Sequence, residues 1–167
     1  MQPATPRIDP TAFVADTARV LGDVTIGRHV VVMFGAVLRA EFDRITVGER
    51  TNVQDNSVLH VDEGVPCHVG SDVIIGHAAV VHGATVGNHC LIGIGACALN
   101  RSIVGEGAWL GAGSVLSEGA AIPPWTLAVG TPARPIRELT EADIQRQRRG
   151  VADYQRIGEA YRALQAP

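Results

Sequence analysis

Three histidines are the residues of this chain whose spacing invites a chemical interpretation. His77 and His82 lie five positions apart in the apolar stretch IIGHAAVVH of residues 74–82, and His60 ends the earlier stretch SVLH. A separation of five places two side chains about 140° apart on an α-helix and on opposite faces of a strand. Neither element brings His77 and His82 into one site, so a longer periodicity must position them.

A six-residue repeat of aliphatic or small residues supplies that periodicity. Three early runs start at Val14, Val47 and Val69, and the uninterrupted part comprises Val86, Ile92, Ala98, Val104, Leu110, Leu116, Ile122 and Ala128. Only 4% of the residues are aromatic although 46% are hydrophobic, as a narrow aliphatic interior requires. Hexapeptide repeats predict an all-β solenoid, a parallel β-helix in which three short faces make one coil of about eighteen residues.

The repeat is interrupted at three places. Three extra residues follow Leu38, four follow Leu59, and one residue is missing after Val81. Insertions in a solenoid project as loops, often on the functional side of the molecule. We therefore expect loops after Leu38 and Leu59.

The pattern changes after the stretch GTPARPIREL. Thr140 is a suitable N-cap, and the residues that follow predict a helix with a kink or break at Gly150. The apolar stripe of this helix comprises Val151, Tyr154, Ile157, Tyr161 and Leu164. We expect one domain, with the β-helix over residues 1–135 and a C-terminal helical segment over residues 136–167 packed along it.

The repeat sorts the candidate residues into two columns. His60 and His82 each directly follow a repeat residue and are one full coil apart, so they stack about 5 Å from each other. Arg39 belongs to the same column, one coil earlier. Asp55 and His77 form a second column at another corner of the triangle. A face of five or six extended residues spans about 17–20 Å, which keeps His77 away from His82 of the same chain.

Three such prisms packed side by side would bring the two columns together. His60 and His82 would face His77 of the neighbouring chain, and Arg39 would face Asp55. Three imidazoles that leave one coordination position open are the pattern of catalytic zinc sites. The remaining histidines fall in neither column and are interpreted as surface or structural residues: His29, His68 and His89.

The sequence resembles the γ-class carbonic anhydrase family, including its bacterial phenylacetate- and carnitine-operon relatives, over roughly residues 10–165. The resemblance is carried by AVLRAEFDRITVGERTNVQDNSVLHVD, VIIGHAAVVHGATVGNHCLIGIGA and IPPWTLAVGTPARPIREL. It implies a left-handed β-helix, a homotrimer with interfacial zinc sites (iron(II) being the alternative metal), and reversible hydration of CO2 to bicarbonate.

The resemblance also implies roles for individual residues. The metal ligands would be His60 and His82 of one subunit with His77 of its neighbour. The other matching positions are Arg39 and Asp55 as an ion pair between subunits, Gln54 near the metal, and Tyr154 near the pocket.

Three positions depart from the family pattern or match it poorly. Glu41 replaces a shorter acid, and Phe42 stands where archaeal members carry a second acid that helps to export protons. Glu63 lies in the loop where those members have a proton-transfer glutamate, but we interpret it as a solvated loop acid. Proton export is therefore the step that we expect to be slow.

Two other functions stay open at this point. Many hexapeptide proteins are CoA-dependent acyltransferases, and an acyltransferase or thioesterase would use a histidine base without a metal. A non-catalytic metal-binding scaffold is the third option.

Composition excludes several kinds of partner. The net charge of −3 gives no footprint for nucleic acid, and no run approaches the ~20 apolar residues of a membrane span. The three cysteines have no CxxC spacing, and the N-terminus MQPATPRIDP does not read as a secretory signal. We therefore expect reduced thiols and a cytoplasmic location.

Overall fold

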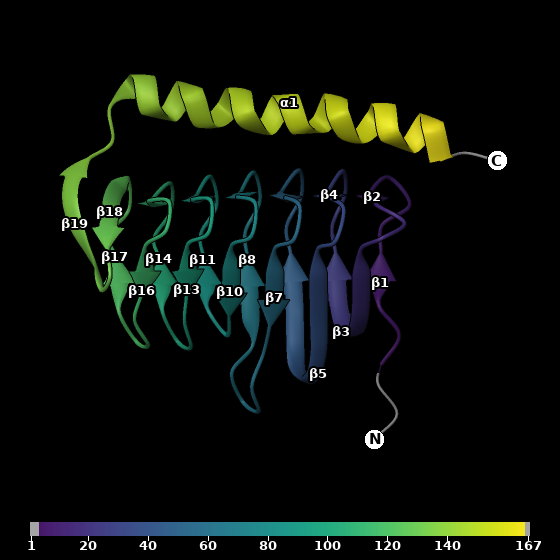
Figure 1. The fold of residues 1–167 in the computed structure, drawn as a ribbon, viewed down its shortest axis with the longest axis horizontal. Helices are drawn as coiled ribbons and strands as arrows, with labels where there is room; N and C mark the ends of the chain where they lie inside the picture. Colours follow the sequence, from purple (N-terminus) through teal and green to yellow (C-terminus); the bar gives the residue numbers. More distant parts are fainter. Residues whose placement is uncertain (1–3, 166–167) are drawn as a thin grey trace.

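The chain forms a parallel β-helix with one long α-helix lying along it (Figure 1). The structure is a computed structural model, and it describes residues 4–165. Each coil contributes short strands that pair in parallel with the coils before and after it. The predicted fold class, a parallel β-helix of hexapeptide repeats with a C-terminal helix, is confirmed.

Two faces of the prism belong to one sheet. Its strand order is β16-β13-β10-β7-β5-β8-β11-β14-β17, with β3 paired to β5 and β1 paired to β3. The sheet is continuous around a corner because β5 pairs with β7 through its first residues and with β8 through its last. Its strands are β1 (Arg7–Ile8), β3 (Arg19–Ile26), β5 (Val37–Val47), β7 (Val58–His60), β8 (Cys67–Val69), β10 (Val80–His82), β11 (Thr85–Val86), β13 (Cys97–Ala98), β14 (Ile103–Val104), β16 (Val115–Leu116) and β17 (Ala121–Ile122).

A second sheet forms the third face, in the order β19-β18-β15-β12-β9-β6-β4-β2. Only β19 runs antiparallel to its neighbour, β18, and these two strands close one end of the solenoid. The strands are β2 (Phe13–Val14), β4 (Val31–Val32), β6 (Asn52–Val53), β9 (Ile74–Ile75), β12 (Leu91–Ile92), β15 (Trp109–Leu110), β18 (Thr126–Gly130) and β19 (Ala133–Glu138). β19 runs across residue 135, where the sequence analysis divides the β-helix from the C-terminal helical segment. That division stays a prediction.

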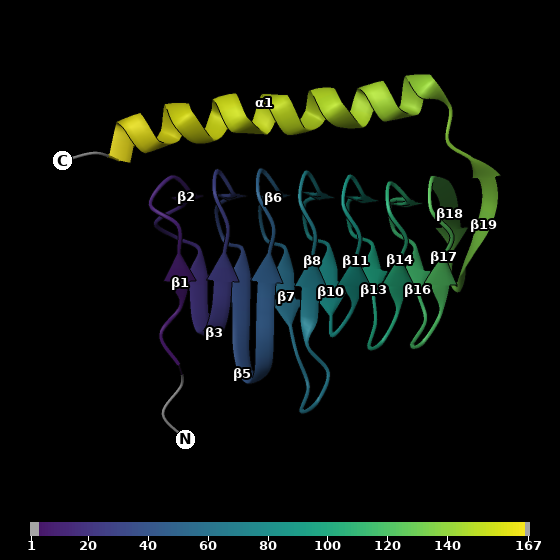
Figure 2. The ribbon, with the colours of Figure 1, turned by 180° about the vertical axis from the view of Figure 1, so that it is seen from behind.

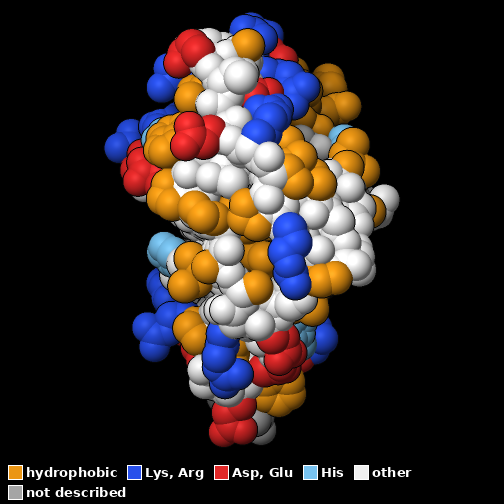
Figure 3. All heavy atoms as spheres, turned by 90° about the vertical axis from the view of Figure 1, so that its left-hand side faces the viewer, with side chains coloured by type: hydrophobic (Ala, Val, Ile, Leu, Met, Phe, Trp, Pro, Cys, Tyr) orange, Lys and Arg blue, Asp and Glu red, His pale blue; other side chains and the backbone are white. Residues whose placement is uncertain are grey.

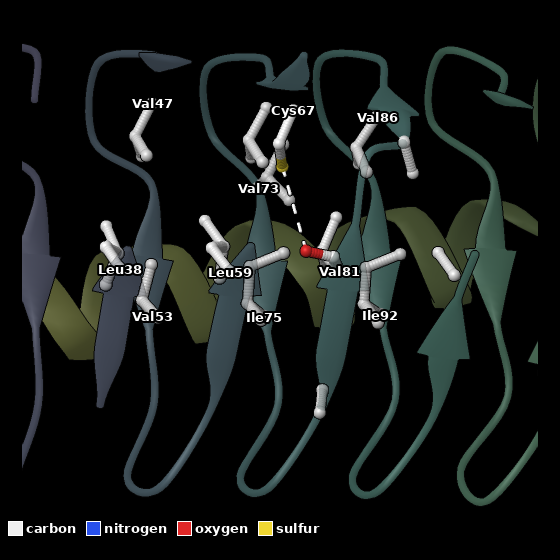
Figure 4. Packing of buried hydrophobic residues seen from close by; sticks show 14 of the residues in the cluster. Leu38, Val47, Val53, Leu59, Cys67, Val73, Ile75, Val81, Val86 and Ile92 are labelled. Carbon is white, nitrogen blue, oxygen red and sulfur yellow. Dashed lines mark hydrogen bonds between the residues drawn. The ribbon is translucent and has the colours of Figure 1, made fainter. Parts of the chain in front are cut away.

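The repeat residues are the core, and they stack in register from coil to coil. Leu38 pairs with Leu59, Leu59 with Val81, and Val81 with Ala98, and all four are fully buried. Figure 4 shows Leu38, Leu59 and Val81 pointing into the narrow interior. The buried repeat residues belong to one core cluster, so the period of the sequence is also the period of the packing.

The three cysteines are free thiols. Burial raises the pKa of Cys67 and of Cys90 to about 12 in each case. The Cys67 thiol donates a weak hydrogen bond to the Val81 carbonyl oxygen (Figure 4). Neither buried thiol is available as a nucleophile at neutral pH, so both act as small core residues.

The two insertions project from the prism on the side away from the helix (Figures 1 and 2). The second insertion is the expected loop, between β7 and β8. The first is not a loop, because β5 continues through all of it and its register with β3 shifts between Gly22 and Val24. The extra residues are absorbed as a bulge in a long strand, because the ladder with β3 passes from Ala40 directly to Ile45.

Helix α1 (Glu141–Gln165) begins at the predicted cap. Thr140 Oγ1 accepts from the Asp143 backbone N–H at 3.2 Å, and Asp143 Oδ2 accepts from the Thr140 N–H at 3.0 Å. The expected apolar stripe faces the prism through Val151, which is buried, but ends before Leu164, which is 79% exposed.

The sequence predicts a kink or break at Gly150, but the helix continues through this residue. The predicted break is therefore wrong. Gly150 instead faces Ile74, and a Cβ at this position would lie 2.8 Å from Ile74 Cδ1. Gly158 faces Val31 in the same manner. These glycines allow the helix axis to approach the sheet closely, which offsets their low helix propensity.

The end of the solenoid that β18 and β19 close has no surface patch of a single charge sign. Viewed from the end closed by β18 and β19, hydrophobic, basic and acidic side chains are interspersed (Figure 3). Among residues 4–165, no helix combines the length and the apolar character needed to cross a bilayer.

Candidate metal centre

His60 and His82 lie side by side at the ends of neighbouring strands. β7 and β10 pair in parallel with His60 opposite His82, and the two ring centroids are 4.9 Å apart. His60 Nδ1 and His82 Nε2 face each other at 2.9 Å. Arg39 is opposite His60 on the other side. The stacking expected for the first column is therefore confirmed.

Asn100 determines which nitrogen of His82 carries the proton. Its Nδ2 donates to Asp62 Oδ2 at 2.7 Å, and this contact orients the amide because an ionised carboxylate only accepts. Asn100 Oδ1 consequently faces His82 Nδ1 at 2.7 Å and accepts its N–H. The other nitrogen of neutral His82, Nε2, is left with a free lone pair.

Glu41 offers a comparable contact to His60. Its Oε2 lies 3.3 Å from His60 Nε2, and it accepts that N–H in the tautomer that leaves the lone pair of neutral His60 on Nδ1. Burial lowers the pKa of His60, and the charges of Arg39 and then His82 lower it further. His60 is therefore held in its neutral, metal-binding form near pH 7.

His60 Nδ1 and His82 Nε2 share a hydrogen bond when the proton of neutral His60 is on Nδ1, and they offer two lone pairs when that proton is on Nε2 beside Glu41. In the second tautomer a metal ion that binds both nitrogens would satisfy both lone pairs. Asp62 completes a group in which His60, Asp62 and His82 each offer one ligand atom, all within 4.8 Å of one another. Two imidazoles and a carboxylate fit zinc or iron(II), so the donor chemistry suits the metal that the sequence predicts.

Gly83 permits this arrangement. It follows His82 with φ at +54°, and a Cβ there would collide with Asn100 Oδ1 and Val65 Cγ1. Without a side chain, Gly83 lets Asn100 and the loop after β7 close on the histidine pair.

Sequence reasoning missed Asp62 and Asn100. The column did not point to Asn100, because the coil after His82 is one residue short and its register places Leu99, one position before Asn100, next to His82. Asp62 carried no signal either, since it lies in the insertion where the six-residue count fails.

His77 belongs to a second cluster at another corner, as expected. Its Nδ1 lies 3.0 Å from Asp55 Oδ2, and its Nε2 lies 3.4 Å from the Tyr154 hydroxyl on α1. Gln54 Oε1 accepts from the His77 backbone N–H at 3.2 Å, and Gln54 Nε2 donates to Asn52 Oδ1. The structure therefore groups Gln54, Asp55, His77 and Tyr154, and it does not bring His77 to the His60–His82 pair within one chain.

The remaining predicted residues lie around the first cluster. Arg39 forms an ion pair with Glu41 of its own chain, so its expected pairing with Asp55 of a neighbour stays a prediction. The exposed Phe42 ring makes an edge contact with His60, with centroids 6.4 Å apart. Glu63 is exposed on the loop, in keeping with its interpretation as a solvated acid.

Comparison with known proteins shows the family. A carbonic anhydrase of Geobacillus kaustophilus (strain HTA426) is 43% identical over 161 residues, which cover 96% of this chain and 88% of the relative. The chain belongs to the γ-class carbonic anhydrase and hexapeptide-repeat transferase family. The resemblance found in the motifs is thereby confirmed.

Other members of this γ-class family carry a different description. The uncharacterized transferase YtoA of Bacillus subtilis (strain 168) is 46% identical over 160 residues, covering 96% of this chain and 94% of YtoA. The crystal structure of a hexapeptide transferase family protein from Anaplasma phagocytophilum matches with a TM-score of 0.90 at 38% identity, covering 93% of this chain and 92% of that one. No protein-family model matches the chain. Family membership alone therefore leaves the reaction open, and the site must decide it.

Proposed function

We propose that the protein is a metal-dependent carbonic anhydrase that catalyses the reversible hydration of CO2 to bicarbonate. The observation that carries this proposal is the close approach of two imidazole nitrogens, His60 Nδ1 and His82 Nε2, at 2.9 Å. Each ring is fixed by an acceptor on its far nitrogen, as is usual for metal-binding histidines. The carbonic anhydrase relative at 43% identity supports the choice of reaction.

In this proposal His60 and His82 hold zinc, or alternatively iron(II), and a neighbouring subunit of a homotrimer supplies His77. The separation of the two clusters at different corners supports an interfacial site. The metal supplies Lewis-acid activation of water near neutral pH. Arg39 would pair with Asp55 across the same interface, and Gln54 and Tyr154 would arrive beside the metal with His77.

The residues of this chain prepare the site. Glu41 and Asn100 hold the two rings so that His60 Nδ1 and His82 Nε2 face one place, where these nitrogens would hold the metal. Phe42 offers half-exposed apolar surface against His60, which suits an apolar gas better than a charged substrate. The free thiols favour a reducing compartment, so we place the protein in the cytoplasm.

Metal analysis followed by a CO2 hydration assay on the same anaerobically purified sample tests the proposal. We expect about one metal per chain and hydration activity that a chelator abolishes and added zinc or iron(II) restores. His82→Ala should lose both metal and activity. His29→Asn, at a histidine outside both clusters, should keep both and serves as the matched control. Fully metallated protein without hydration activity would contradict the proposal.

An acyltransferase or thioesterase is the second candidate function, and the transferase YtoA supports it. That chemistry would use a histidine as general base and would need no metal. The same sample separates the two functions, because acyl transfer would survive removal of the metal.

A further inference from the structure

The loop after β7 presents Asp62 to the histidine pair. Residues 62–65 form a tight turn in which the Val65 N–H donates to the Asp62 carbonyl oxygen at 3.0 Å, and Gly64 adopts φ of +67°. The Asp62 carboxylate is held separately, through its Oδ2, by Asn100 Nδ2 at 2.7 Å. Both ends of Asp62 are therefore fixed, although the residue is exposed.

The carboxylate lies within metal-ligand range of both rings. Ligand atoms of His60, Asp62 and His82 are within 4.8 Å of one another, all in one chain. Asn100 bridges two of these groups, since it donates to Asp62 and accepts from His82. A shared partner of this kind fixes the relative positions of two ligands, as outer-shell residues do in metal sites. Asp62 also supplies the negative charge that two neutral imidazoles lack.

We infer that His60, Asp62 and His82 form a half-site that binds a divalent metal ion within a single chain, before a neighbouring subunit contributes His77. The inference rests on the metal centre of the proposed function, and it makes Asp62 the third metal ligand within a single chain. On assembly, His77 of the neighbouring subunit joins Asp62 at the metal or replaces it. Metal loading is then a property of the chain, and the interface adds the last ligand.

Zinc binding in a His77→Ala background tests the half-site. His77→Ala should still bind about one zinc ion per chain, measured by competition with a chromophoric chelator. The double variant His77→Ala/Asp62→Ala should bind zinc at least about 10-fold more weakly, because losing a ligand should cost no less than losing an outer-shell partner. His77→Ala/Glu63→Ala removes the neighbouring loop acid instead and should match His77→Ala.

Equal zinc affinity in His77→Ala and His77→Ala/Asp62→Ala would overturn the inference, as would complete loss of zinc from His77→Ala. Circular dichroism should first show an intact β-helix, and His77→Gln provides a second background if alanine disturbs that corner. Cobalt(II) absorption of His77→Ala should change on Asp62→Ala and stay constant on Glu63→Ala. Wild-type protein that loads metal but does not hydrate CO2 would refute the proposed function alone and leave the half-site standing.

Discussion

Phe42 is the side chain at the centre whose chemistry departs most from what fast CO2 hydration needs. It is 51% exposed and lies against His60, beside the acid Glu41. Glu41 is already engaged by Arg39 and His60, so it is poorly placed to pass protons to solvent. The proton released in hydration must then reach buffer directly.

We predict that hydration activity rises with the concentration of imidazole buffer, and that Phe42→Glu removes much of this dependence. The new carboxylate would accept the proton at low buffer, so activity there should rise several-fold and change little at high buffer. Stopped-flow hydration assays over a buffer series measure both effects. Leu21→Glu is the matched control, because Leu21 is equally exposed at 50% and stacks on Arg39 rather than on His60.

An activity of the wild-type protein that does not vary with buffer would contradict this prediction. So would a Leu21→Glu variant that matches Phe42→Glu, since general surface charge would then explain the gain.

Single residues also show how far sequence reasoning reached. The repeat predicted the stacking of His60 on His82, because residues at the same position of successive coils lie next to each other. It could not find Asp62, because side-chain direction in an inserted turn depends on tertiary contacts such as the hydrogen bond from Asn100. The contacts of Glu41 and Asn100 that orient the two rings are likewise invisible in the sequence.

At the level of elements, the helix was predicted from its cap and its stripe, but its fit to the sheet was not. Gly150 was interpreted as a kink or break because glycine is a poor helix former. The structure shows that the missing side chain of Gly150 leaves room for Ile74 to pack against the helix. The long strand β5 is a similar case, because extra residues in the repeat do not reveal whether they form a loop or a bent strand.

We predict a favourable coupling between Gly150→Ala and Ile74→Val. Alanine should stabilise the helix by up to about 1 kcal/mol, but its Cβ meets Ile74 Cδ1, which valine removes. In a double-mutant cycle measured by urea unfolding, the double variant should be more stable than additivity predicts by about 0.5–3 kcal/mol.

Gly158→Ala combined with Ile74→Val is the control for this cycle, because Gly158 faces Val31 instead. That pair should be additive within about 0.5 kcal/mol. An additive Gly150→Ala/Ile74→Val pair would show that the helix does not pack on Ile74 through this glycine.

For the whole molecule, the β-helix was predictable in class and in strand register because the sequence repeats with the period of the packing. Assembly was predicted from the two columns, and the structure adds that each column is built into its own hydrogen-bonded cluster. His60 and His82 gather Glu41 and Asn100, while His77 gathers Asp55 and Tyr154. In the proposed function, a complete site takes one cluster from each of two chains.

Mixed trimers of His77→Ala and His82→Ala chains test this central claim most directly. Each variant alone should lack CO2 hydration, since every site misses one histidine. After unfolding and refolding an equal mixture with zinc, about one quarter of the sites should combine an intact His60–His82 pair with an intact His77 from a neighbour. We predict that hydration activity returns to about that fraction of the wild-type value. A mixture that forms trimers and binds zinc at its intact His60–His82 pairs but stays inactive would contradict the interfacial carbonic anhydrase site.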